Sequence, residues 1–110
     1  MTRLMHPSLT THFIVRLAQR YDIVGNYAAA ETWCADIASG RAELVWVFPH
    51  LGSRTYRLLD RRTGTRFFAV VSADGVFITA PEPCSFERTD AGWYQLHPME
   101  RLARQQGAVA

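Results

Sequence analysis

Hydrophobic residues follow a strand-like pattern through the middle of the chain, from residue 42 to residue 80. Four runs rich in β-branched and aromatic residues are separated by short turn sequences. They predict strands over residues 44–48, 54–60, 65–72 and 76–79. Gly64 and Gly75 stand in the second and third turns, where glycine accommodates a left-handed backbone. Because the connections are short, we expect neighbouring strands to be antiparallel.

The first of these runs is apolar on both faces. Leu44, Trp46 and Phe48 alternate with Val45 and Val47. Such a pattern is typical of a strand that is covered on both sides. We therefore expect residues 44–48 to be buried on both faces, with Trp46 in the core.

Helical periodicity precedes the strands. Apolar residues recur at helical spacing between residues 9 and 21, and Ser8 or Thr10 can cap the start of a helix there. The β-branched pair Ile14 and Val15 leaves a strand over residues 13–17 as the alternative. The pattern favours the helix.

A second helix is predicted over residues 27–39, between an Asn26 cap and Gly40. Glu31 and Asp36 are expected to face away from its buried side. The predicted buried stripe is Ala30, Trp33, Cys34 and Ile37.

The C-terminal part of the chain predicts smaller elements. Residues 86–88 and 93–96 flank a turn sequence and predict a short hairpin. Pro98 is suited to the first position of a last helix. Residues 1–7 are expected to form a flexible arm, and residues 105–110 a frayed tail.

Taken together, these patterns predict an α+β fold in one domain spanning residues 1–110. Two N-terminal helices would pack on an antiparallel β-meander of four to six strands. The hydrophobic fraction of 48% is that of a folded chain. The sequence has neither a run of about 20 apolar residues nor a secretory signal, so we expect a soluble cytoplasmic protein without a membrane partner. Cys34 and Cys84 are expected to be reduced thiols.

No catalytic or cofactor motif is recognisable. The four histidines, His6, His12, His50 and His97, are too far apart to predict a metal site. Gly52, Gly64 and Gly75 stand alone and form no phosphate-binding loop. No serine lies in a nucleophile motif, and the spacing of Cys84 and His97 gives no support for a thiol nucleophile. We therefore expect no metal, no cofactor and no catalytic residue.

Arginine is the distinctive feature of the composition. All 12 basic residues are arginine, and the net charge is only +2. Codon bias in a GC-rich genome would explain this, and so would selection for forked contacts with phosphate or carboxylate. Five arginines lie within 13 residues around the second turn, with Tyr56 and Phe68 as aromatic neighbours. The predicted binding residues are Arg54, Tyr56, Arg57, Arg61, Arg62 and Arg66.

These residues suggest a small non-enzymatic binding or regulatory protein. The arginine-rich hairpin would bind an anionic partner, either an acidic protein surface or nucleic acid. Mobile-element accessory proteins and inhibitors are often of this size. The alternative is a solvated turn with local pairs to Asp60 or Glu43. If the hairpin binds either kind of anionic partner, replacement of Arg61, Arg62 and Arg66 is expected to weaken binding and to leave the fold intact. A further possibility is an assembly role, with Trp93 and Tyr94 at an oligomer contact.

The predicted order of elements resembles that of the bacterial ribosome-dependent ribonuclease toxins of toxin-antitoxin systems. The resemblance implies metal-independent RNA cleavage, with Arg, Lys, Tyr and His side chains positioning the RNA. It rests on two helices followed by a four-stranded antiparallel sheet that carries arginines. The first strand that precedes the helices in that family is not predicted here, and this chain has no lysine.

Overall fold

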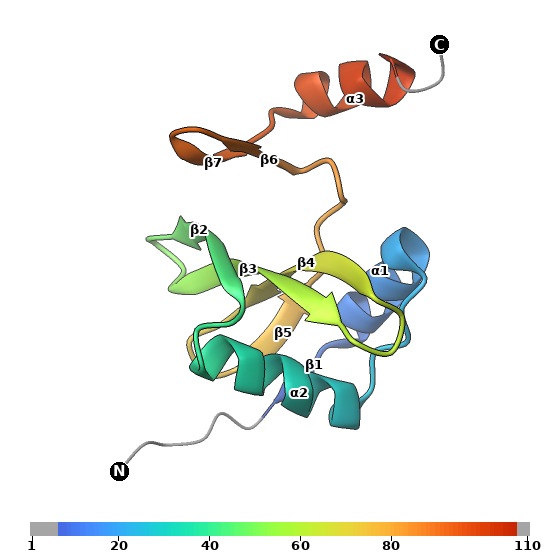
Figure 1. Cartoon of the computed structure of the whole chain (residues 1–110), viewed down its shortest axis with the longest axis vertical. Coiled ribbons are helices and arrows are strands. Elements are labelled where there is room, and N and C mark those ends of the chain that lie inside the picture. The colour runs from blue at the N-terminus through green and yellow to red at the C-terminus, as the bar shows by residue number, and fades with distance from the viewer. Residues whose placement is uncertain (1–6, 108–110) are drawn as a thin grey trace.

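A computed structural model describes residues 7–107, and residues 1–6 and 108–110 lie outside the described residues (Figure 1). His6, most of the expected arm and the end of the expected tail therefore lie outside it. Residues 105–107 belong to the last helix. The elements in chain order are β1 (Ser8–Leu9), α1 (Thr11–Tyr21), α2 (Tyr27–Ala38), β2 (Glu43–Phe48), β3 (Ser53–Asp60), β4 (Thr65–Val71), β5 (Val76–Thr79), β6 (Phe86–Thr89), β7 (Gly92–Gln95) and α3 (Pro98–Gly107).

The α+β prediction is confirmed. Strands β2 to β5 form the expected antiparallel meander, and they belong to a five-stranded sheet of order β1-β5-β4-β3-β2. Strands β6 and β7 form a separate two-stranded sheet. In Figure 1, α1 and α2 lie on one side of the large sheet, and the β6–β7 hairpin and α3 lie on the other. None of the helices in residues 7–107 has the length and apolar character needed to cross a membrane.

The large sheet is mixed and not purely antiparallel, because β1 pairs in parallel with β5. The backbone N–H of Ser8 donates to the carbonyl oxygen of Gly75 at 3.3 Å, and that of Thr10 donates to Phe77 at 3.2 Å. A two-residue strand carries no periodicity of its own. The sequence pattern therefore did not predict a strand before the helices, and the structure shows that β1 stands there.

Helix α1 is confirmed over the competing strand, and its start is fixed by a side chain. The Thr10 hydroxyl oxygen accepts a hydrogen bond from the backbone N–H of Phe13 at 3.0 Å. The same hydroxyl donates to the carbonyl oxygen of Ile78 at 2.9 Å. Asn26 caps α2 as predicted, with its side-chain oxygen 2.8 Å from the backbone nitrogen of Ala29.

The main core lies between the two N-terminal helices and the sheet. Trp33 of α2 is 1% exposed, and its ring packs on Phe67 with the ring centroids 4.9 Å apart. Phe13 of α1 and Phe77 of β5 complete this aromatic group. Other buried members are Leu17, Ile23, Ala29, Ala30, Cys34, Leu58, Ala69, Val71 and Ala80.

A second, smaller cluster covers the opposite face of the sheet. Val45 and Phe68 are buried against Phe86, and Trp46 and Trp93 pack around them. Strand β4 serves both clusters, because successive side chains point to opposite faces: Phe67 joins the main core, and Phe68 joins the second cluster. The β6–β7 hairpin is therefore attached to the sheet through apolar contacts.

The expected burial of β2 on both faces is wrong. This strand forms an edge of the sheet, and Leu44 and Val47 are 46% and 45% exposed. A β-bulge between Leu44 and Trp46 shifts the register, so Leu44 does not share a face with Trp46. Trp46 is half-buried against the second cluster and lies outside the main core.

Candidate anion-binding cleft

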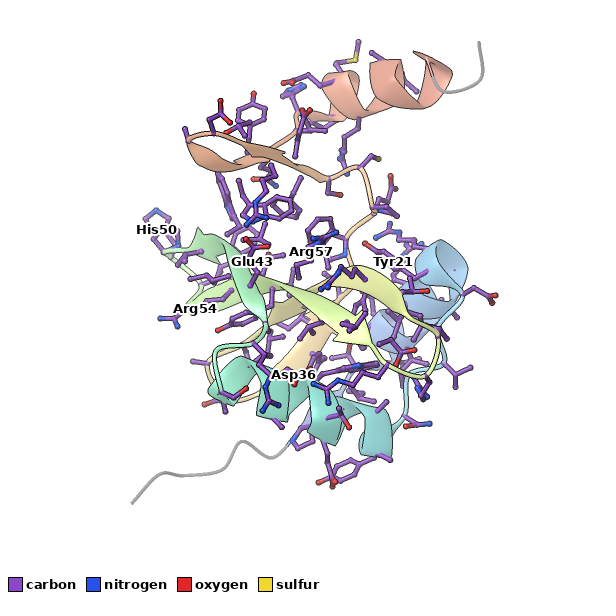
Figure 2. The ribbon with its side chains drawn as sticks, viewed as in Figure 1. Tyr21, Asp36, Glu43, His50, Arg54 and Arg57 are labelled. Atoms are coloured by element: carbon purple, nitrogen blue, oxygen red, sulfur yellow. The ribbon has the colours of Figure 1, made fainter. Side chains whose placement is uncertain are left out.

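The β3–β4 hairpin carries all six of the predicted binding residues, but the structure divides them into three groups. Strand β3 ends at Asp60, so Arg61 and Arg62 belong to the turn. Arg54 and Tyr56 lie toward the start of β3 on the helix side. Arg57 and Arg66 lie on the opposite face. Figure 2 shows Arg57 on the side of the β6–β7 hairpin and Asp36 on the side of α2.

Arg61 is held by α2. Its guanidinium donates a 2.8 Å hydrogen bond to the Asp36 carboxylate, and Arg41 lies 3.7 Å from the same oxygen. Asp36 was expected to face away from the buried side of the helix, and this is wrong, because the residue is only 4% exposed. A carboxylate can be buried at this position because arginine neutralises it. Arg61 therefore fastens the hairpin tip to the helix.

Arg62 is also engaged within the protein. Its Nε donates to Asp60 at 3.0 Å, and its terminal nitrogen donates to the carbonyl oxygen of Val24 at 2.7 Å. Asp60 is 1% exposed and also accepts a hydrogen bond from the Thr63 hydroxyl. The guanidinium carbon of Arg62 lies 5.9 Å from the centroid of the Trp33 ring. The predicted local pair with Asp60 is confirmed for this arginine.

Arg54 is exposed and distant from the turn. Together with Tyr56 it lines a shallow hollow beside Ile37, Gly52 and Val71. In Figure 2 it lies at the end of the sheet near His50. Since Arg54 and Tyr56 occupy the helix side of β3, they do not share a surface with Arg57.

Arg57 and Arg66 lie on the same face of neighbouring strands. Arg57 pairs in register with Phe68, which is two residues beyond Arg66 on β4. Such diagonal neighbours have their backbones about 7–8 Å apart. Among the residues whose side chains are described, none forms an ion pair with Arg57 or Arg66. The positive charges of these two residues are therefore not neutralised by any carboxylate among the described side chains, although Arg57 contacts the Trp93 ring.

A cleft of about 230 Å³ adjoins both arginines. It lies between the face of the sheet and the segment that leads into the β6–β7 hairpin. The Arg57 guanidinium carbon is 5.9 Å from the centroid of the Trp93 ring. The residues lining the cleft are Tyr21, Arg57, Arg66, Phe67, Phe68, Pro83, Phe86 and Trp93.

Two arginines lie near the Trp93 ring. Arg57 approaches it from the sheet, and the guanidinium carbon of Arg88 in β6 is 5.5 Å from the same ring centroid. Arg88 also forms an ion pair with Glu43 of β2. The indole N–H of Trp93 is buried without an acceptor among the described residues. Of the two arginines near the ring, only Arg57 belongs to the lining of the cleft.

Tyr21, the last residue of α1, also lines the cleft. Its hydroxyl donates to the carbonyl oxygen of Pro81 at 2.5 Å and accepts from the backbone N–H of Phe68 at 3.3 Å. Burial raises the pKa of Tyr21 to about 12, although the hydrogen bond from Phe68 opposes the shift. The phenol is therefore neutral at physiological pH. It can offer its ring to a ligand but no charge, and its hydroxyl is already engaged by Pro81 and Phe68.

The cleft differs from the predicted site in its aromatic residues. Tyr21, Phe86 and Trp93 come from segments far from the hairpin in sequence, and no spacing rule connects them. The described residues that line the cleft include neither a histidine nor a carboxylate. In the described part of the chain, no three His, Cys, Asp or Glu side chains gather as in a metal site. The cleft therefore presents guanidinium groups and aromatic rings to a ligand.

Comparison with protein-family models, with curated proteins and with solved structures finds no match to this chain.

Proposed function

We propose that this protein is a small non-enzymatic binding protein that holds nucleic acid on the face carrying Arg57 and Arg66. One observation carries the proposal. The two guanidinium groups share a face, have no ionic partner among the described side chains, and border a cleft lined by Tyr21, Phe86 and Trp93. Two of the predicted arginines, Arg61 and Arg62, are instead occupied by buried carboxylates.

The residues around the cleft favour a phosphate backbone. Guanidinium groups donate paired hydrogen bonds that match phosphate oxygens. Two further arginines, Arg20 and Arg88, instead form ion pairs with Glu82 and Glu43 and are not counted in this site. An acidic protein would satisfy the same charges, but its carboxylates would leave the aromatic rings of the cleft without a partner. Arginine combined with aromatic rings is typical of nucleic-acid surfaces.

The salt dependence of binding tests this proposal. Affinity for RNA and for DNA would be measured between about 50 and 200 mM salt, where each phosphate contact contributes roughly 0.7–0.9 to the logarithmic slope. The double variant Arg57→Gln/Arg66→Gln is expected to reduce this logarithmic slope by the contribution of about two phosphate contacts. Arg54→Gln is the matched control, because it changes an arginine of the same strand on the opposite face of the sheet.

The outcomes separate the two classes of partner. An unchanged slope in the folded double variant would contradict the proposal. Binding of polyglutamate as strong as that of RNA, with the same dependence on Arg57 and Arg66, would point to an acidic protein instead. Loss of slope for nucleic acid alone supports the proposed function.

A metal-independent ribonuclease resembling the ribosome-dependent toxins is the second candidate. One observation favours it: β1 precedes the two helices, so the chain has the order β-α-α-β-β-β-β that the resemblance requires. Against catalysis, the described lining of the cleft has no histidine or carboxylate to move a proton, and Tyr21 stays protonated. Incubation of messenger RNA with the protein, with and without ribosomes, tests this candidate. Cleavage that Arg57→Gln abolishes would favour it over the binding protein.

A further inference from the structure

We infer that the cleft between Tyr21 and Trp93 receives an unpaired base, so that the protein prefers single-stranded nucleic acid to duplex. This inference rests on the proposed function and specifies the form of nucleic acid. Its starting point is the position of the aromatic rings, which lie beside the two available arginines and not at a separate place on the surface.

The rings come from three separate segments of the chain. Tyr21 ends α1, Trp93 belongs to β7, and Phe86 begins β6. Phe86 is buried, whereas Tyr21 and Trp93 are each partly exposed. The Trp93 ring stands perpendicular to Phe68 at the base of the cleft, with an interplanar angle of 89° and the centroids 5.6 Å apart. The fold thus brings aromatic rings from separate segments to the lining of one small opening.

The size of the opening limits what it can hold. Its volume of about 230 Å³ is below the roughly 300–1,000 Å³ of pockets that bury drug-sized ligands. One planar base is a suitable occupant, while the sugar and phosphates of its strand remain outside. The exposed guanidinium of Arg66 and the half-buried one of Arg57 lie where that backbone would pass.

A base within a duplex cannot occupy the cleft, because it is already stacked and paired. Unpaired bases readily stack on aromatic rings and on guanidinium planes. Arg57 lies over the Trp93 ring and adds such a plane to the wall. The cleft therefore adds a contribution that only single strands obtain, while the arginine charges attract both forms.

The test compares a fluorescein-labelled oligo-uridine of about 12 nucleotides with an RNA duplex of the same length, by fluorescence anisotropy. We expect the single strand to bind roughly 5- to 150-fold more tightly, the contribution of one stacked base. Trp93→Leu is expected to remove most of this preference, since stacking of one base contributes a factor of roughly 5 to 150. The salt slope is expected to persist, because the arginines remain. Tyr27→Leu is the matched control, since Tyr27 is an exposed aromatic residue of α2 outside the cleft.

Equal affinity for single strand and duplex would overturn the inference. A folded Trp93→Leu variant that keeps the full preference would do the same. If Trp93→Leu does not fold, a fluorescence measurement on the Trp46→Phe variant replaces it. In that variant Trp93 is the accessible tryptophan, because Trp33 is buried, so quenching by oligo-uridine reports on Trp93. Quenching supports the inference, and its absence overturns it. If single strand and duplex bind equally and both depend on Arg57 and Arg66, the proposed function stands and only the base site is rejected. If neither single strand nor duplex binds, the proposed function and the base site are both rejected.

Discussion

The Arg61 guanidinium donates a 2.8 Å hydrogen bond to the buried carboxylate of Asp36 and so joins the tip of the β3–β4 hairpin to α2. The two residues are 25 positions apart in the chain. Arg61 itself is 53% exposed in its side chain, whereas that of Asp36 is 6% exposed. Only the Asp36 member of this ion pair is therefore buried. The free-energy cost of breaking the pair comes mainly from leaving the Asp36 carboxylate without its partner.

Arg61→Ala is expected to lower the free energy of unfolding by about 1–3 kcal/mol, the usual range when a charged group loses its hydrogen-bond partner. Urea unfolding measures the change. This differs from the expectation that Arg61 can be replaced without loss. Arg66→Ala, in the same hairpin but without an ion pair among the described side chains, should stay within about 0.5 kcal/mol. Equal effects from the two variants would contradict the role given to Asp36.

Tyr21 is expected to make stability depend on alkaline pH. Its pKa in the folded protein is about 12, above the ordinary value near 10, so folding favours the protonated phenol. This contribution to stability is complete below pH 10 and is lost as the pH rises toward 12. Unfolding midpoints between pH 8 and 12 would show the loss in the native protein. Tyr21→Phe removes the titrating group, so its midpoint should fall less over the same range.

An ultraviolet titration provides an independent check on Tyr21. Phenolate absorbance in the native protein should include a late step near pH 12 that is missing from Tyr21→Phe. At neutral pH the same variant should lose about 1–2 kcal/mol of stability, because it gives up the hydrogen bonds to Pro81 and from Phe68. A titration curve that keeps its late step in the variant would assign that step to another residue.

The substitution of Gly64 tests the turn at the hairpin tip. Its φ is +74°, and a Cβ at this position would meet nothing within 4 Å. The cost of a substitution is therefore that of the backbone conformation alone. Gly64→Val should destabilise by roughly 1–2 kcal/mol, and Gly64→Asn by less, because asparagine tolerates the left-handed region. Thermal unfolding of the two variants would reject the assignment if their melting temperatures were equal.

Two tryptophans should differ in their contribution to stability. Trp33 is 1% exposed and packs against three aromatic rings of the main core, so Trp33→Ala is expected to cost about 3–5 kcal/mol. Trp46 lies half-buried on an edge strand, and Trp46→Ala should cost about 1–2 kcal/mol. Chemical denaturation of both variants gives the ranking. A larger loss of unfolding free energy in Trp46→Ala than in Trp33→Ala would contradict this ranking and indicate that Trp46 belongs to the core.

Thr10 joins β1, α1 and the end of β5 through one hydroxyl. Thr10→Val removes the cap on Phe13 and the hydrogen bond to Ile78 while keeping the side-chain shape. We expect a loss of about 1–2 kcal/mol in urea unfolding, as for other lost N-caps. Thr11→Val, at the exposed first residue of the helix, is the control and should change stability little. Similar losses in both variants would show that the hydroxyl of Thr10 is unimportant.

Local signals predicted the parts of this fold that depend on local chemistry. Gly64 and Gly75 have φ values of +74° and +88°, as the turns around them required. The caps at Thr10 and Asn26 also depend on residues only three positions away. Such features can be predicted from a single sequence because the interacting groups are neighbours in the chain.

Features that depend on distant residues were not predictable in the same way. Asp36 is polar and was assigned to the solvent side, since nothing near it in sequence reveals that Arg61 would reach it. Arg57 and Arg61 have the same side chain, yet one faces the cleft and the other binds α2, because β3 ends between them. Tyr21 and Trp93 share the cleft only through the tertiary fold. The sequence therefore predicted an arginine-rich hairpin, but not which arginines remain available.

The pairing of β1 with β5 has a consequence for how the chain is made. Thr10 is joined to Ile78 by a hydrogen bond that spans 68 positions. During synthesis from the N-terminus, β1 emerges first and its partner strand last among the strands of the large sheet. The ribosome must therefore release almost the whole of the two-helix and meander region before that edge of the sheet can close. Contacts of such long range slow folding, so completion of this domain is a late event that follows translation of β5.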